Sequence, residues 1–321
     1  MGFVSNDFTR AFGLDVPIVQ GPAGGVTGPE LVAAVAEAGA LGVLPIWITS
    51  PAGAARLIEA TRRLTARAFA VNLRADLVQS DHVAAAVDAG VSDFHLFWGD
   101  PAPSMPRIRA AGGRTICTIG DVEAARVALD AGADALVAQG VEAGGHVLGE
   151  VPLRELLEAV LPLAGRIPVI AAGGLMDAGD VAAMLALGAS AALLGTRFVA
   201  TRESLAHDAY KQALMDAGKD ATVRSCCFDG GWPDAPHRNL KNSTFAAWDR
   251  AGRPAPGARP GEGEVVLRLG TVAIERYAAT PPRRDMSGDA EAAVMYAGTG
   301  VARLADCPDT ADLVRSLTTL L

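Results

Sequence analysis

A short unit recurs through the first 200 residues of the chain. Each copy has an alanine-rich helical run, a small-residue turn with glycine, and a short aliphatic strand, as in VAEAGALGVLPI, AVDAGVSDFHLF, ALDAGADALVAQ and LALGASAALLGT. Gly39, Gly90, Gly132 and Gly188 stand where each helix should end, at a position that favours a left-handed backbone. The repeat therefore restricts the fold to alternating helices and parallel strands.

Eight such units follow one another along the chain. Their strands are continuous apolar runs, as expected for a parallel sheet buried on both faces. Eight units of this kind predict an α/β fold, a closed (β/α)8 TIM barrel. An open doubly wound sheet is the rival, but the turn QGPAGGVTG lacks a G-x-G-x-x-G fingerprint in register. Strands are expected at 16–20, 41–46, 67–72, 92–97, 114–118, 134–138, 168–171 and 191–194.

The repeat stops after Ala200. Residues 201–218 are expected to be helical, and residues 219–290 are rich in proline, glycine and arginine. Within that region we expect a single strand or helix pair near 264–279. The composition predicts a small second domain that caps the barrel.

The C-terminal tail returns to an apolar turn followed by an amphipathic helix, with Asp309 as its expected cap. We expect this helix to pack back on the barrel. The predicted organisation is a TIM barrel made of residues 1–205 and 290–321, interrupted by a smaller inserted cap or substrate domain at 206–289.

Charge and cysteine content exclude several classes of protein. Lys and Arg number 28 against 36 Asp and Glu, so no positive field favours a nucleic acid. The four cysteines form no C-x-x-C pair, which favours reduced thiols in the cytoplasm and indicates no metal site. The most apolar stretch, 181–195, is shorter than the roughly 20 residues of a bilayer span. We expect a cytoplasmic protein that binds neither nucleic acid nor membrane.

In a TIM barrel the active site lies where the strands end, so the residues just after each strand are the candidates. Gly173-Gly174 and Gly195-Thr196 follow the seventh and eighth predicted strands. Glycines let backbone N–H groups approach an anion without a Cβ in the way. These two turns predict a phosphate-binding cradle.

The sixth predicted strand is followed by a second candidate group. Gln139 can donate to and accept from the edge of a heterocycle, and the glycines after it leave room for a flat ring. His146 is expected in a flexible glycine-rich loop at the mouth, where its side chain could move a proton. His95, inside the fourth strand, could face either side, and His237 could line the site or fix a loop.

These motifs closely resemble those of the nitronate monooxygenase family, formerly called 2-nitropropane dioxygenases. The resemblance covers about 10–205 and resumes near residue 290. Its most specific part is the G-x-E-A-G-G-H motif in AQGVEAGGHVLG. It is also carried by VPIVQGPAGGVTGPELVAAVAEAGALG, by PVIAAGGLMDAGDVAAMLALGASAALLGTRF and by the late MYAG.

The resemblance implies FMN, bound non-covalently at the C-terminal face of the barrel, with His146 as the acid/base. Family members commonly carry Met where this chain has Ala23, which predicts a wider or differently shaped pocket. The residues implied to bind the cofactor are Pro22, Ala23, Asn72, Gln139, Gly144, Gly145, Gly173, Gly174, Leu193, Leu194, Gly195 and Thr196.

The implied reaction converts a small-molecule substrate, an alkyl nitronate, to a carbonyl compound and nitrite with O2 and without NAD(P)H. One alternative is an NAD(P)H-dependent flavin reductase of a quinone or an enoyl thioester on the same fold. Another is a phosphate-binding barrel without redox chemistry. A homodimer is one candidate assembly, and the physiological substrate stays open.

Overall fold

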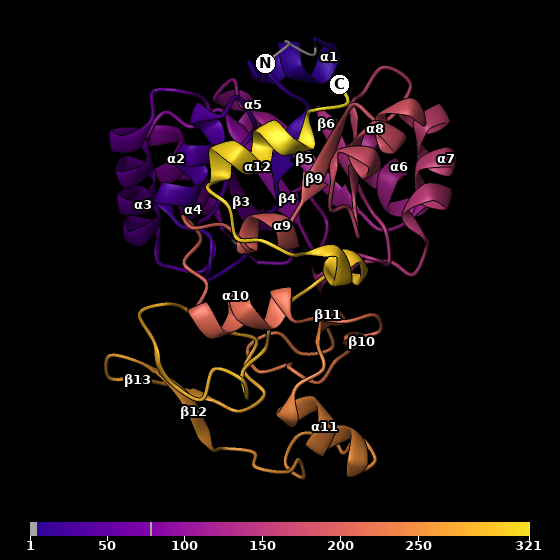
Figure 1. Cartoon of the computed structure of the whole chain (residues 1–321). Helices are drawn as coiled ribbons and strands as arrows, with labels where there is room; N and C mark the ends of the chain where they lie inside the picture. Colours follow the sequence, from indigo (N-terminus) through magenta and orange to yellow (C-terminus); the bar gives the residue numbers. More distant parts are fainter. Residues whose placement is uncertain (1–4, 78) are drawn as a thin grey trace.

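An eight-stranded parallel sheet lies inside the ring of helices in the upper part of the molecule (Figure 1). The computed structural model describes residues 5–77 and 79–321. An isolated parallel bridge joins Val19 to Leu41, so the two outermost strands meet and the sheet closes into a barrel. The strands run in the order β1 (Ile18–Gln20), β9 (Ala191–Leu194), β8 (Val169–Ala172), β6 (Ala135–Gln139), β5 (Arg114–Ile119), β4 (Asp93–Phe97), β3 (Ala70–Arg74) and β2 (Val43–Pro45). The predicted TIM barrel is confirmed.

Helices surround the barrel because each follows a strand and turns its apolar face inward. The predicted turns between them are also found: Gly39 and Gly132 adopt φ of 84° and 88°, where a side chain would be strained. The helices are α2 (Pro29–Glu37), α3 (Pro51–Leu64), α4 (Ser80–Asp88), α5 (Met105–Ala110), α6 (Val122–Asp130), α7 (Leu153–Ala164), α8 (Ala178–Ala186) and the short α9 (Thr196–Val199).

The two ends of the barrel are closed by different parts of the chain. Helix α1 (Asp7–Phe12) covers the N-terminal end, where Phe8 and Phe12 pack against strand residues of the barrel interior such as Val19 and Ile116. The segment after α9 covers the opposite end, where the strands terminate at their carboxyl ends (Figure 1). The barrel therefore opens toward this second segment.

The segment that covers the open end is more regular than the sequence indicated. The expected pair near 264–279 is present, as β12 (Val265–Leu269) and β13 (Val272–Glu275). Three elements of this segment were not predicted: β10 (Thr222–Ser225), β11 (His237–Leu240) and α11 (Ser243–Arg250). The short strand β7 (Gly145–His146), which follows β6, pairs with β11 and forms a three-stranded sheet with β11 and β10.

The expected helix over 201–218 is wrong in its first part. Helix α10 spans Asp208–Met215, because the His207 side chain accepts a hydrogen bond from the Ala209 amide and caps it there. A further short strand, β14 (Ser287–Gly288), pairs with β12 and ends this region. The proposed domain boundaries near residues 205 and 290 stay a prediction.

The C-terminal helix α12 (Thr310–Leu317) packs against α2 and α8, as predicted, and completes the ring of helices. It follows a short 3-10 helix, η1 (Thr299–Arg303). The expected capping bond is absent from the described hydrogen bonds, although Asp309 holds the N-cap position. Asp309 instead pairs with Arg202, and the Glu203 carboxylate accepts from the Thr310 amide.

The cap segment and the barrel share an apolar core. Val26 and Met176 from the barrel loops pack in one cluster with Tyr210, Leu240 and Met295. A shared core fixes the cap over the barrel mouth, because separating the two would expose this apolar surface to water. Within the described part of the chain, no helix is both long and apolar enough to cross a membrane.

Candidate active site

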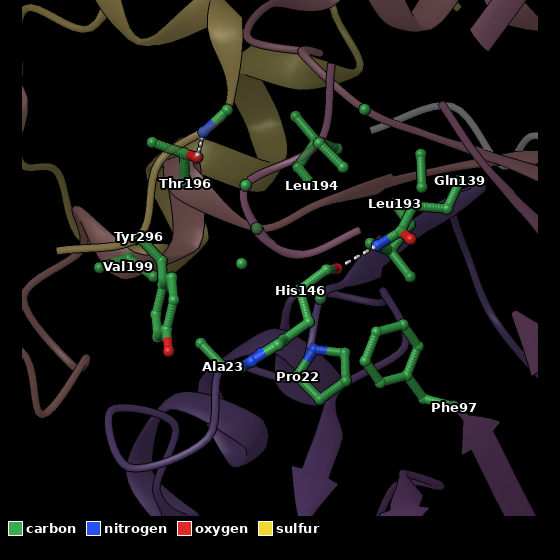
Figure 2. A pocket seen from close by; sticks show the side chains of 18 of the residues that line it. Pro22, Ala23, Phe97, Gln139, His146, Leu193, Leu194, Thr196, Val199 and Tyr296 are labelled. Atoms are coloured by element: carbon green, nitrogen blue, oxygen red, sulfur yellow. Dashed lines mark hydrogen bonds between the residues drawn. The ribbon is translucent and has the colours of Figure 1, made fainter. Parts of the chain in front are cut away.

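A cavity lies at the carboxyl ends of the barrel strands, beneath the cap (Figure 2). The space between its walls, including the part open to solvent, is about 1160 Å³. The structure brings every residue predicted for the site to this one cavity: Pro22, Ala23, Asn72, Gln139, Gly144, Gly145, His146, Gly173, Gly174, Leu193, Leu194, Gly195 and Thr196. Among the described lining residues there is no Asp, Glu, Lys or Arg.

A chain of hydrogen bonds crosses one side of the cavity, from β2 to β5. The Trp47 indole donates to Oδ1 of Asn72 at 3.1 Å, so the Asn72 amide nitrogen faces Nδ1 of His95, also at 3.1 Å. Nε2 of His95 lies 2.7 Å from the Thr118 hydroxyl. Because an indole only donates, this order of donors places the His95 proton on Nε2.

His95 faces the cavity, which the sequence left undecided. It is 4% exposed, and burial lowers its pKa to about 4. A neutral imidazole is favoured there because no acidic side chain among the described lining residues could stabilise a charged one. His95 and Asn72 therefore form a neutral, rigid part of the wall.

His146 is held more firmly than the sequence indicated. The expectation of a flexible loop is wrong, because His146 belongs to β7 and pairs with His237 of β11. The Gln139 amide donates to the His146 carbonyl at 3.0 Å and accepts from the Leu148 amide at 3.0 Å (Figure 2). Gln139 thus fixes the backbone around His146, a role that the sequence did not predict.

The His146 imidazole is buried and neutral. It is 9% exposed, and Nε2 has no hydrogen-bond partner among the described residues. Burial, and then His237 and Arg74, lower the pKa of His146 to about 2. A proton on this ring is favourable only when a negative charge lies beside it.

His237 has a structural role instead of lining the cavity. Its Nε2 accepts from the Phe228 amide at 3.2 Å, and its Nδ1 lies 3.0 Å from the Ala235 carbonyl. These two contacts close the loop between residues 228 and 237. Of the two roles that the sequence left open for His237, the structure shows the fixing of a loop.

The two predicted glycine turns meet at one end of the cavity. Gly174 has φ of 69°, which disfavours any side chain at this position. Gly195 has a φ of −98°, and a Cβ added there would meet no atom within 4 Å. The Thr196 hydroxyl accepts from the Gly298 amide at 3.0 Å, so the C-terminal segment closes this end (Figure 2).

Sequence comparison assigns the chain to a family. The family profile described as nitronate monooxygenase matches residues 6–89 and 80–319. The chain belongs to the nitronate monooxygenase family. A nitronate monooxygenase from Pseudomonas aeruginosa is 32% identical over 365 residues, with 98% of each chain covered.

Two further relatives of this family member are named for other oxidation reactions. An octahydro-indene-carboxyl-CoA dehydrogenase from Mycobacterium tuberculosis is 38% identical over 236 residues, or 73% of this chain. The alignment spans 65% of that dehydrogenase. The crystal structure of a nitroalkane oxidase from Streptomyces ansochromogenes is 33% identical, with a TM-score of 0.78 and 97% and 96% coverage of the two chains. The chain is therefore an enzyme, an oxidoreductase.

Some cavity residues of this nitronate monooxygenase family member were not predicted. Trp47 directly follows the second predicted strand, 41–46, so the rule that residues after strands line the site could have found it. Tyr296 lies in the MYAG motif, and its hydroxyl donates to the Ala279 carbonyl at 3.0 Å. Trp232 comes from the cap segment, where no periodic pattern marks it. The described residues hold no cluster of three or more His, Cys, Asp or Glu suited to a metal.

Proposed function

We propose that the protein is an FMN-dependent enzyme that oxidises alkyl nitronates to carbonyl compounds and nitrite, with O2 as the final electron acceptor. One observation carries the proposal. A single cavity joins the backbone turns at Gly174 and Gly195 to the buried His146, and no charged side chain is among its described lining residues. Such a cavity suits a flat, largely apolar ring with one phosphate at its end.

The described residues fit FMN at two points. At Gly195 a Cβ would enter open space, so the backbone leaves room for a phosphate at the cavity wall. The second glycine turn, at Gly174, also lines the cavity without a side chain, so backbone groups of both turns can face the same phosphate. When bound, FMN would accept electrons from the substrate and pass them to O2.

The protein's own contribution is to orient the substrate and to handle one proton. His146 can accept a proton at Nε2, and an anion formed beside it would compensate for the cost of burying the charge. The chain of Trp47, Asn72 and His95 stays uncharged and holds the wall of the cavity in place. The cap covers the cavity and shares an apolar core with the barrel loops, which limits the contact of the site with bulk water.

A second candidate reaction is the oxidation or reduction of an acyl thioester. The 38% identity to a CoA dehydrogenase supports it. The alternative without redox chemistry loses its support, because the relatives named above are oxidoreductases. The cytoplasmic location, the homodimer and the use of O2 stay predictions from the sequence.

The proposed function is tested first by the content of the purified protein. We expect a yellow protein that releases FMN, not FAD, on denaturation, because the cavity offers one cradle for a phosphate. Added alkyl nitronate should cause O2 consumption and nitrite release without a pyridine nucleotide. A colourless protein that binds no added FMN would contradict the proposal, and so would turnover of an acyl-CoA with none of a nitronate.

A further inference from the structure

The indole of Trp232 is held between two polar side chains in the cavity wall. Its ring centroid lies 3.8 Å from that of His146, with 21° between the planes. The guanidinium carbon of Arg74 lies 3.4 Å from the same indole centroid. Both groups are too close to the ring centre to share one face without overlapping, so His146 and Arg74 cover opposite faces of the indole.

Further contacts hold Trp232 in place. Its ring meets those of Trp47 and Trp98 edge-on, at centroid distances of 5.4 and 5.3 Å. At the base of its loop, the Gly230 amide donates to the Tyr277 carbonyl at 3.0 Å. The indole is 6% exposed, so it is part of the cavity wall and not a surface side chain.

Two polar atoms on the stacked rings have no partner. Nε1 of Trp232 and Nε2 of His146 are both buried, and neither makes a hydrogen bond to any described residue. An unpaired buried donor is unfavourable, and in native structures such groups are few. The indole N–H can only donate, so the missing partner of Trp232 is an acceptor.

The charge behind the indole favours an anion as that partner. Arg74 is 7% exposed and pairs with Asp76, whose side chain is 31% exposed. The described lining of the cavity holds no carboxylate that would offset Arg74 from the other side. A guanidinium stacked on an indole lowers the electron density of the ring, which makes the N–H a better donor to a negative oxygen.

We propose that Trp232 binds the substrate through its indole N–H and that, together with His146, it selects a small planar oxyanion over a neutral molecule. The inference rests on the proposed function and deepens it, because a nitronate carries two oxygen atoms on one planar nitrogen. One oxygen accepts from Nε1 of Trp232, and the other accepts from Nε2 of His146 when that nitrogen carries the ring proton. The site then favours the nitronate over the neutral nitroalkane from which it derives.

Trp232→Phe tests this role, because phenylalanine keeps an aromatic ring between His146 and Arg74 and loses the N–H donor together with one ring of the indole. Trp248→Phe is the matched control. Trp248 is half-buried in α11 outside the cavity, stacks on Arg253, and already donates its indole N–H to the Pro254 carbonyl at 3.0 Å. Both variants lose one indole, but only Trp232→Phe alters the proposed anion site.

Two measurements on the holoenzyme separate this inference from the proposed function. The first is the binding of nitrate, a planar oxyanion that the enzyme cannot oxidise, by titration calorimetry. The second is kcat and KM for an alkyl nitronate. We expect Trp232→Phe to weaken nitrate binding and to raise KM by about 10- to 150-fold, the effect of one lost hydrogen bond to a charged group, with little change in kcat. Trp248→Phe should stay within about twofold of the original enzyme.

Each outcome has a separate meaning. If the original enzyme oxidises the nitronate but Trp232→Phe binds nitrate as tightly as the original enzyme does, the inference is overturned and the proposed function stands. Absence of nitrate binding to the original holoenzyme would also overturn the inference. Weakened nitrate binding in Trp232→Phe, in an enzyme that oxidises no nitronate, would support the anion site and refute the proposed function.

Discussion

Gly195→Ala is the most direct perturbation of the proposed phosphate cradle, because the added Cβ lines the cavity and meets no other protein atom within 4 Å. The Gly195 backbone has φ of −98° and ψ of −68°, which alanine adopts without strain. The added Cβ would meet no protein atom within 4 Å, and Gly195 lines the cavity. The new methyl group therefore projects into the space that we assign to the phosphate.

The expected effects on stability and on binding have opposite signs. Alanine restricts the unfolded chain, so the free energy of unfolding of the flavin-free protein should stay unchanged or rise by about 0.4–1 kcal/mol. The methyl group would block one hydrogen bond from the backbone to a phosphate oxygen, worth about 1.5–3 kcal/mol. The dissociation constant for FMN should then rise by about 10- to 150-fold.

The assay is a fluorescence titration of flavin-free protein with FMN and, in parallel, with riboflavin, which lacks the phosphate. Gly195→Ala should weaken the binding of FMN and leave the dissociation constant for riboflavin within about twofold of that of the original protein. Gly218→Ala is the control, because Gly218 lies outside the cavity, has no positive φ and would also gain a Cβ in open space. Unchanged FMN affinity, or an equal loss for riboflavin, would refute the position of the cradle.

Three further predictions concern the histidines and the loop before β7. Burial holds the folded-state pKa of His95 near 4 against 6.5 when unfolded, so the unfolded state binds more protons between these values, and stability falls as pH drops through that window. Urea unfolding at pH 7 and at pH 5 measures this effect. On going from pH 7 to pH 5, the free energy of unfolding should fall by about 2 kcal/mol less in His95→Asn than in the original protein. His146→Asn should slow a neutral nitroalkane by about 10²–10⁴-fold and the nitronate by no more than about tenfold. Only the nitroalkane must lose a proton, and the asparagine amide can still donate to a nitronate oxygen. Equal losses on both substrates would assign His146 to binding alone. A Cβ at Gly144 would lie 2.5 Å from the Gly298 backbone nitrogen, so Gly144→Ala should lower the free energy of unfolding by about 1–3 kcal/mol; thermal unfolding unchanged from the original protein would contradict this packing.

The barrel and most of the cavity could be predicted because their signals are local. Each helix, turn and strand repeats within a few residues, and the repeat places polar and glycine residues directly after strands. Gln139 and Gly174 were found in this way, because a strand end in a TIM barrel always faces the same rim. Local patterns were therefore enough to predict the fold and the residues at the strand ends.

What the sequence did not show depends on contacts between distant segments. His146 looked flexible from its glycine neighbours, but β7 pairs with β11 from the cap and is fixed there. Trp232 stacks on His146 from a loop with no periodicity, so no local pattern could place it in the cavity. Asp309 begins α12 as expected, yet its carboxylate pairs with Arg202, a choice that only the folded chain decides.

The central claim, that a nitronate is the electron donor, is tested most directly by mixing the oxidised holoenzyme with an alkyl nitronate in the absence of O2. The account predicts rapid bleaching of the flavin with no pyridine nucleotide present, followed by recovery of the yellow colour when O2 is admitted. NADH alone should bleach the flavin slowly or not at all. Fast bleaching by NADH with no response to the nitronate would contradict the account and identify a reductase on this fold.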